Sequence, residues 1–270
     1  MKLILSLFAL LCGLYLFAIR CRSGHPGLKA LQGWNYAHRG LHNKPQIPEN
    51  SMAAFRAALE KGYGIEMDVH LMKDGNLAVI HDSLLKRTTG AEGRIEDLTT
   101  EQLKDYRLEG TEETIPTFRE LLDLYSGKAP LIIELKPQGG NHEALVDAAV
   151  KAMEGYEGSW CMESFDPRCI MVLKRKYPRI IRGQLSEDFP KNDPKMNKAL
   201  AFVLKHLLMN FLTVPDFIAY RFDQRWRTPS TKLCLGLWKA QGVTWTLRDP
   251  KDHPVAQQEG WLPIFENYIP

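Results

Sequence analysis

The sequence predicts an α/β protein built on a parallel sheet. Short apolar runs, most of them closed by a polar residue, alternate along the chain with segments whose apolar residues recur at helical spacing. Such alternation is typical of a parallel sheet whose strands are joined by helices. The strand candidates are residues 34–38, 65–71, 77–81, 131–136, 160–165, 180–185, 216–220, 243–247 and 262–265.

Eight of these runs are expected to form one closed sheet. Residues 73–76, Lys-Asp-Gly-Asn, predict a tight turn, so the second and third candidates pair as a hairpin and not through a crossover helix. Eight parallel strands separated by helices predict a (β/α)8 TIM-type barrel. The polar, acid-rich stretch 83–115 predicts a small insertion after the second barrel strand.

Helices are expected between the strands, and several have capping signals. Asn50 precedes the first helix, Thr117 and Glu120 form a capping box, and Asp166 precedes Pro167 at a first helical position. The helix candidates are residues 51–61, 117–125, 142–156, 167–177, 194–210 and 231–241.

The N-terminus differs from the rest of the chain. Residues 3–19 are uncharged and apolar, and as a helix they would reach about 25 Å, near the lower limit for spanning a bilayer. No small-x-small cleavage site ends the run, which favours a retained anchor. Basic residues after the run outweigh those before it, so the positive-inside rule favours a cytoplasmic catalytic domain. We predict a single-pass membrane anchor and linker at residues 1–24, preceding a barrel at residues 25–270.

Composition excludes one class of partner. The formal net charge of +3 is small and the basic residues form no long tract, so no nucleic-acid partner is expected. The five cysteines lack the close pairs of a zinc site or disulfide framework, which fits a reducing compartment. The basic and apolar stretch 195–214 allows two interpretations: a membrane-facing helix near the anchor, or a barrel helix with a solvated basic edge.

Three acidic residues lie within apolar strand candidates. Glu66 and Asp68 are two residues apart, so on a strand both side chains face the same side. Glu134 also lies within an apolar run, and Lys136, two residues later, faces the same side of the strand. Carboxylates that converge in a dry cavity repel each other unless a cation intervenes, and a hard divalent metal meets that need. The alternative is that each acid lies on a solvent-facing side of its strand.

Two histidines end strand candidates. His38 and His81 each follow an apolar run, at the end of the strand where β/α barrels form their active sites. Two imidazoles could serve as acid and base on opposite sides of a phosphorus, although a histidine at a strand end can also be a hydrogen-bonded structural residue. Arg39 and Lys136 are suited to neutralise phosphate oxygens.

These residues fall within motifs that resemble the glycerophosphodiester phosphodiesterase family over residues 36–166. The motifs are Ala-His-Arg-Gly at 37–40, Pro-Glu-Asn-Ser at 48–51, Glu-Met-Asp-Val at 66–69, Lys-Asp-Gly at 73–75, Ala-Val-Ile-His-Asp at 78–82, Arg-Thr-Thr-Gly at 87–90, Ile-Pro-Thr at 115–117, Glu-Leu-Lys at 134–136 and Ser-Phe-Asp at 164–166.

The resemblance implies a barrel enzyme with one Mg²⁺ or Ca²⁺ ion that hydrolyses glycerophosphodiesters to an sn-glycerol phosphate and an alcohol. The implied roles are metal ligands for Glu66, Asp68 and Glu134, acid and base for His38 and His81, and phosphate contacts for Arg39 and Lys136. Glu49 is a further candidate ligand, or a group that supports one.

The C-terminal half departs from the family pattern, since Leu247-Arg248 replaces a usual Val-Asn pair. Phe165, Arg221 and Trp245 are either leaving-group contacts or ordinary rim packing. Two alternative functions stay open: lysophospholipase D-like hydrolysis of membrane lysophospholipids at the same site, and non-catalytic binding of phospholipid headgroups. Direct attack by water and a cyclic phosphate route are both compatible with the residues, and the sequence leaves the oligomeric state undefined.

Overall fold

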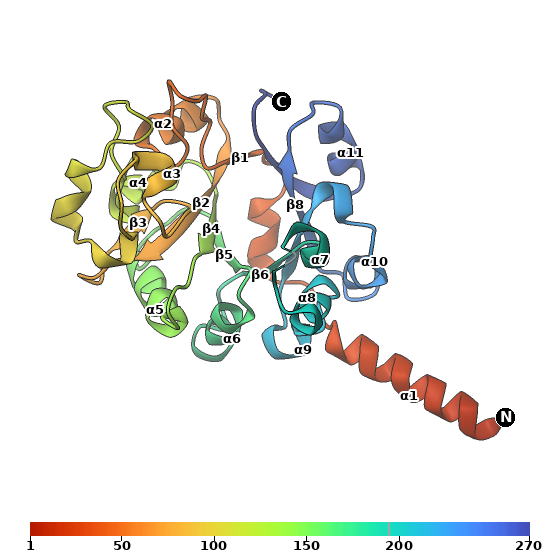
Figure 1. Ribbon diagram of the computed structural model, residues 1–270. Helices are drawn as coiled ribbons and strands as arrows, with labels where there is room; N and C mark the ends of the chain where they lie inside the picture. Colours follow the sequence, from red (N-terminus) through yellow and green to blue (C-terminus); the bar gives the residue numbers. More distant parts are fainter. Residues whose placement is uncertain (194) are drawn as a thin grey trace.

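The computed structural model describes residues 1–193 and 195–270. Nine strands form one sheet in the order β1-β9-β8-β7-β6-β5-β4-β2-β3, and a further pairing of β1 with β2 closes it into a barrel surrounded by helices (Figure 1). Eight strands are parallel, and β3 pairs antiparallel with β2, as predicted. The strands are β1 Tyr36–His38, β2 Gly64–Leu71, β3 Leu77–Val79, β4 Leu131–Leu135, β5 Trp160–Ser164, β6 Arg182–Ser186, β7 Phe217–Arg221, β8 Gln241–Leu247 and β9 Trp261–Phe265.

The helices follow the strands around the outside of the barrel. Short 3-10 helices occupy Pro26–Leu31, Ile95–Asp97, Thr100–Asp105 and Phe222–Gln224. The α-helices are α1 Lys2–Ala18, α2 Met52–Glu60, α3 Lys86–Thr89, α4 Phe118–Tyr125, α5 His142–Ala152, α6 Pro167–Lys176, α7 Phe189–Asn192, α8 Lys198–Lys205, α9 Asn210–Thr213, α10 Pro229–Gly236 and α11 Asp252–Gln258.

Helix ends confirm two of the three predicted caps. The Thr117 and Glu120 capping box begins α4, and Asp166 accepts from the backbone of Arg168 at the start of α6. The cap of α2 is Ser51, whose side chain accepts from Ala54 N at 3.1 Å, so the prediction of Asn50 was wrong by one residue.

The predicted helix 194–210 is interrupted. Its first residue, Pro194, lies outside the described residues. Within the remainder, residues 198–205 form α8, and α9 begins only at the last predicted residue, Asn210. Leu207 takes a φ of +56°, which is incompatible with a continuous right-handed helix. The four-residue α7 and the helix α11 were not predicted; α7 is too short to show helical periodicity.

The predicted membrane anchor is wrong. Helix α1 is present and extends away from the barrel (Figure 1), but it has 17 residues. Across residues 1–193 and 195–270, no helix is long and apolar enough to cross a membrane. A bilayer core requires about 20 apolar residues in a helix. The predicted cytoplasmic orientation was argued from the charges on either side of that span, so it loses its basis as well.

Two apolar layers enclose the strands. An outer core packs the strands against the helices, while an inner core fills the barrel with side chains such as Tyr36, Ile132, Cys161, Phe217 and Ile264. Because side chains alternate along a strand, residues two positions after these inner ones also face the barrel axis. The inner positions therefore identify which polar side chains reach the barrel mouth.

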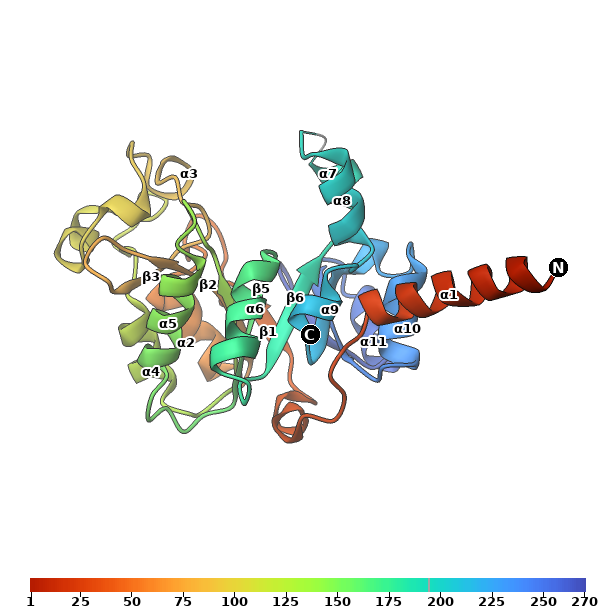
Figure 2. The ribbon, with the colours of Figure 1, turned by 90° about the horizontal axis from the view of Figure 1, so that it is seen from below.

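The segment 83–115 has its own small apolar core. Leu85, Ile95, Leu98, Leu103 and Leu108 are buried there against residues of β3 and its flanks. Figure 2 shows that α3, from this segment, and the pair α7 and α8 stand out on the same side of the barrel. That side is the carboxyl end of the strands, because α7 directly follows β6.

Candidate active site

Polar side chains occupy the inner positions at the carboxyl ends of the strands. His38 follows Tyr36 by two residues, Glu134 follows Ile132, Glu163 follows Cys161 and Glu266 follows Ile264. Apolar residues therefore fill the lower barrel and polar residues its upper end, where the active sites of β/α barrels lie. On β2 the pattern is continuous, with Glu66 and Asp68 both buried.

The three predicted metal ligands come together. One carboxylate oxygen from each of Glu66, Asp68 and Glu134 lies within 4.8 Å of the other two, and all three residues are buried. Lys136 Nζ lies 3.1 Å from Asp68 Oδ1 and 2.7 Å from Glu134 Oε1. Apart from its ion pair with Lys136, the buried Asp68 Oδ1 has no hydrogen-bond partner among the described residues. This set of oxygens fits a hard divalent ion.

Burial and the neighbouring charged groups shift the pKa values of Glu66 and Asp68 in opposite directions. Burial, followed by the charges of Asp68 and Glu134, raises the pKa of Glu66 well above its ordinary value. Burial acts the same way on Asp68, but Lys136, His81, Arg39 and a hydrogen bond from Asn50 hold its pKa well below the ordinary value. One acid of the cluster is thus firmly ionised while its neighbour resists ionisation unless a cation is added.

His38 is fixed by an acid from the last strand. Its Nδ1 lies 2.7 Å from Glu266 Oε2, and its Nε2 lies 3.8 Å from Glu66 Oε2. Burial, followed by the charge of Arg39, lowers the pKa of His38 to about 4 although Glu266 opposes the shift. At neutral pH the imidazole is uncharged. Donation of Nδ1–H to Glu266 leaves the Nε2 lone pair directed toward the carboxylate cluster.

His81 is half-buried and is held by its neighbour in sequence. Its Nδ1 lies 2.5 Å from Asp82 Oδ1, and Arg87 pairs with the same carboxylate. His70 Nε2 lies 3.1 Å from the carbonyl oxygen of His81, and its Nδ1 lies 2.8 Å from Glu96 in the segment 83–115. His70 thus supports the backbone of His81 and lies away from the carboxylate cluster.

Arg39 lies beside the acids and pairs with a further carboxylate, that of Glu49. Arg39 Nη1 donates to Glu49 at 2.8 Å, and its Nε lies 3.4 Å from Asp68 Oδ2. Glu49 also pairs with Lys44 and accepts from Arg87 at 2.7 Å. Glu49 is outside the triad whose oxygens lie within 4.8 Å of one another. Its observed partners are cations, and its role as a metal ligand or as a supporting group stays a prediction.

The predicted rim residues divide into two groups. Phe165 meets Trp245 edge to face at 5.4 Å between ring centroids, and Phe189 of α7 meets Phe165 at 5.9 Å. These rings form one aromatic wall over the ends of β5, β6 and β8. Arg221 is instead paired with Asp223 at 3.0 Å and Glu187 at 3.4 Å. Its role as a leaving-group contact stays a prediction.

Four residues of the site were not assigned from the sequence. Asn50 donates to Asp68 Oδ2 at 2.9 Å, Glu266 binds His38, Phe189 extends the aromatic wall, and Glu163 lies buried beside Glu134. Glu163 and Glu266 follow the rule that revealed the other acids, a polar residue at an inner position near a strand end. Asn50 and Phe189 belong to loop and short-helix segments where no periodicity points to them.

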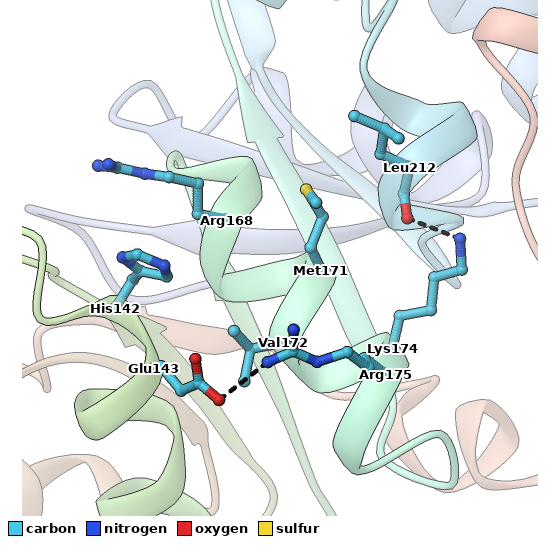
Figure 3. A pocket seen from close by; sticks show the side chains of 8 residues that line it. All are labelled: His142, Glu143, Arg168, Met171, Val172, Lys174, Arg175 and Leu212. Atoms are coloured by element: carbon cyan, nitrogen blue, oxygen red, sulfur yellow. Dashed lines mark hydrogen bonds and ion pairs between the residues drawn. The ribbon is translucent and has the colours of Figure 1, made fainter.

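A separate cavity of about 490 Å³ lies outside the barrel, along α5, α6 and α9. In Figure 3, Arg175 points to Glu143 and Lys174 to the carbonyl oxygen of Leu212, at 2.8 and 2.7 Å. Its cations are therefore occupied by neighbouring groups, and none of the predicted site residues lines it.

Carboxylates, imidazoles and cations gathered at the mouth of a β/α barrel define an enzyme-type centre. A model of the glycerophosphoryl diester phosphodiesterase family matches residues 38–265, so the chain belongs to this family.

Relatives and solved structures agree with this placement. A glycerophosphodiester phosphodiesterase of Caldanaerobacter subterraneus is 37% identical over 159 residues, which cover 55% of this chain and 65% of the relative. One of Bacillus altitudinis is 44% identical over 164 residues, covering 57% and 66%. The matches thus span just under two thirds of these relatives. A phosphodiesterase of Oleispira antarctica, solved with the product sn-glycerol-3-phosphate, shares the fold with a TM-score of 0.71 and 24% identity, covering 92% and 96% of the chains.

Proposed function

We propose that this protein hydrolyses glycerophosphodiesters to a glycerol phosphate and an alcohol with the help of one divalent cation. The observation that carries the proposal is the convergence of Glu66, Asp68 and Glu134 within 4.8 Å. The names of the relatives from Caldanaerobacter and Bacillus support the substrate class. Glu66, Asp68 and Glu134 would hold Mg²⁺ or Ca²⁺, since both take carboxylate oxygens. When bound, the ion supplies Lewis-acid stabilisation of a phosphoryl oxygen.

The basic side chains bind the phosphodiester. Lys136 Nζ, already 2.7 Å from Glu134, presents a point charge beside the carboxylate cluster. Arg39 presents a guanidinium whose buried Nε lies 3.4 Å from Asp68 Oδ2 and donates no hydrogen bond to the described residues. Both groups neutralise charge on the non-bridging oxygens and orient the phosphorus between the imidazoles.

The two histidines move the protons. His38, uncharged at neutral pH and anchored through Nδ1 to Glu266, accepts a proton at Nε2 from the attacking oxygen. His81, anchored through Nδ1 to Asp82, donates a proton from Nε2 to the departing alkoxide. The same assignment serves whether the attacking oxygen belongs to water or to a neighbouring glycerol hydroxyl. A cyclic phosphate trapped during turnover identifies the second route.

A lysophospholipid substrate is the second candidate. The membrane anchor no longer supports it, but α8 exposes Leu200 and Phe202, which are 48% and 54% exposed, and α8 stands on the side of the barrel mouth (Figure 2). An acyl chain could lie against these side chains. Turnover of lysophosphatidylcholine faster than that of glycerophosphocholine favours this candidate, and the reverse order favours the first.

The decisive experiment measures glycerol phosphate released from glycerophosphocholine by the purified chain. We expect release to stop after chelation and to return when Mg²⁺ or Ca²⁺ is restored. Glu134→Gln is expected to lose release under all conditions. Release by the native chain that continues undiminished under chelation contradicts the proposed metal dependence.

A further inference from the structure

Glu163 is a buried acid that the proposed mechanism does not use. It lies on β5 in register with Glu134 of β4, which is itself in register with Asp68 of β2. Cys161, two residues earlier, belongs to the inner core, so the Glu163 side chain also faces the barrel interior. Glu163 is 1% exposed. Three neighbouring strands thus direct carboxyl groups into one space.

The carboxyl group of Glu163 lacks the partners that buried acids normally have. Its Oε2 atom is buried and has no hydrogen-bond partner in the described part of the chain. An acid buried in this way is costly unless a donor or a cation satisfies its oxygens. The nearby Lys136 ammonium is already engaged by Glu134 and Asp68. A water bound to a cation held by the triad would supply the missing donor.

We propose that Glu163 is a fourth acidic group of the metal centre, which lies outside the triad and binds the divalent ion through a metal-bound water. The inference rests on the metal centre of the proposed function and extends it by one residue. A solely structural acid at this position would have been expected to accept hydrogen bonds from its surroundings. Glu163 instead leaves an oxygen free on the strand next to Glu134, outside the triad of Glu66, Asp68 and Glu134 whose oxygens lie within 4.8 Å of one another.

The test is calorimetric titration of Ca²⁺ and Mg²⁺ into the chelator-treated full chain. Glu163→Gln keeps the size of the side chain and removes the carboxylate. We expect its Kd for the ion to rise by roughly 10-fold to 100-fold, the scale seen for groups that support metal ligands. An unchanged Kd overturns the inference.

The melting temperature of the metal-free variant separates this role from a structural one. We expect metal-free Glu163→Gln to melt close to the metal-free native chain, and the stabilisation by added Ca²⁺ to shrink. Equal stabilisation by Ca²⁺ in both chains overturns the inference. Should Glu163→Gln not fold, Glu163→Asp takes its place, because it retains a shorter carboxylate; a Kd equal to the native value then overturns the inference.

Two control variants distinguish a failure of the Glu163 inference from a failure of the proposed metal centre. Glu187→Gln removes a carboxylate that follows β6 and pairs with Arg221, so it makes the same change in net charge outside the cluster. Its Kd is expected to stay at the native value, and a rise equal to that of Glu163→Gln overturns the inference. Glu134→Gln is expected to abolish binding. When Glu134→Gln loses the ion and Glu163→Gln keeps it, only the inference fails; a native chain that binds neither ion removes the proposed metal centre as well.

Discussion

Glu266 links the last strand to the first by binding His38. Glu266→Gln removes the charge that raises the pKa of His38, so the pKa, already lowered to about 4, is expected to fall further. A base works only when it is deprotonated. The acid limb of kcat/KM, expected near this value in the native chain, therefore moves to lower pH in the variant.

The rate should fall as well, because the carboxylate no longer fixes the imidazole. We expect kcat to drop by roughly 10-fold to 100-fold, less than the ~10²–10⁴ of a lost acid or base. The pH profile of kcat/KM measures the first effect, and Glu259→Gln, which removes an acid paired with Arg225, is the control. If the acid limb of kcat/KM lies at the same pH in Glu266→Gln and in the native chain, Glu266 does not act through His38.

His81 should matter more than its supporting residues. His81→Ala removes the group assigned to protonate the leaving alcohol, and we expect turnover of glycerophosphocholine to fall by ~10²–10⁴. His25→Ala is the matched control, because His25 caps a short 3-10 helix before β1 and contacts Arg179. Near-native turnover by His81→Ala refutes the assignment.

How much of the site could be predicted depended on where each residue lies. Glu66 and Asp68 were predicted from strand parity and Glu134 from its place in an apolar strand run, and their convergence is confirmed. Glu266 has the same parity, but it lies just after the last strand, in a segment for which the sequence predicted no element. Asn50 contacts Asp68 from a loop conformation with φ of +52°, and strand or helix periodicity contains no information about such a contact.

At the scale of elements, strand positions followed from local sequence while helix interruptions did not. All nine strand candidates overlap observed strands, because each is a short apolar run between polar segments. The break between α8 and α9 depends on the positive φ of Leu207, a buried residue whose conformation is imposed by packing. The apolar pattern is continuous across the break, so the sequence did not predict the interruption.

An ion pair helps to attach the segment after α1 to the barrel. Arg22 binds Asp216 through two guanidinium nitrogens, with Nη2 at 2.6 Å from Oδ2, and its backbone N–H donates to the carbonyl of Pro215 at 2.8 Å. Asp216 is fully buried. Asp216→Asn leaves the guanidinium without its counter-charge, and we expect a loss of about 2–3 kcal/mol in the free energy of unfolding.

Urea denaturation measures that loss. Asp223→Asn provides the comparison, since it removes an exposed carboxylate paired with Arg221, and surface pairs contribute less than about 1 kcal/mol. Equal free energies of unfolding for Asp216→Asn and the native chain would mean that the Arg22 pair does not stabilise the fold.

For the whole molecule, closure of the barrel depends on filling its interior without overlap. Gly183 of β6 is in register with Phe217 of β7, and the Phe217 ring lies over the space where a side chain at 183 would stand. A Cβ added at Gly183 would lie 2.0 Å from Phe217 Cε2. The sequence could not show this need for glycine, because it arises only when the two strands pair.

Gly183→Ala should therefore destabilise the entire barrel. Overpacking of a close-packed interior costs about 1–3 kcal/mol, and the ring of Phe217 is fully buried with little room to move. For a chain of this size that corresponds to a fall of roughly 2–12 °C in Tm. Gly236→Ala is the control, because a Cβ at this last residue of α10 meets nothing within 4 Å, and alanine favours a helix. Scanning calorimetry of both variants decides the matter: equal melting temperatures would show that the barrel interior accommodates the added methyl group.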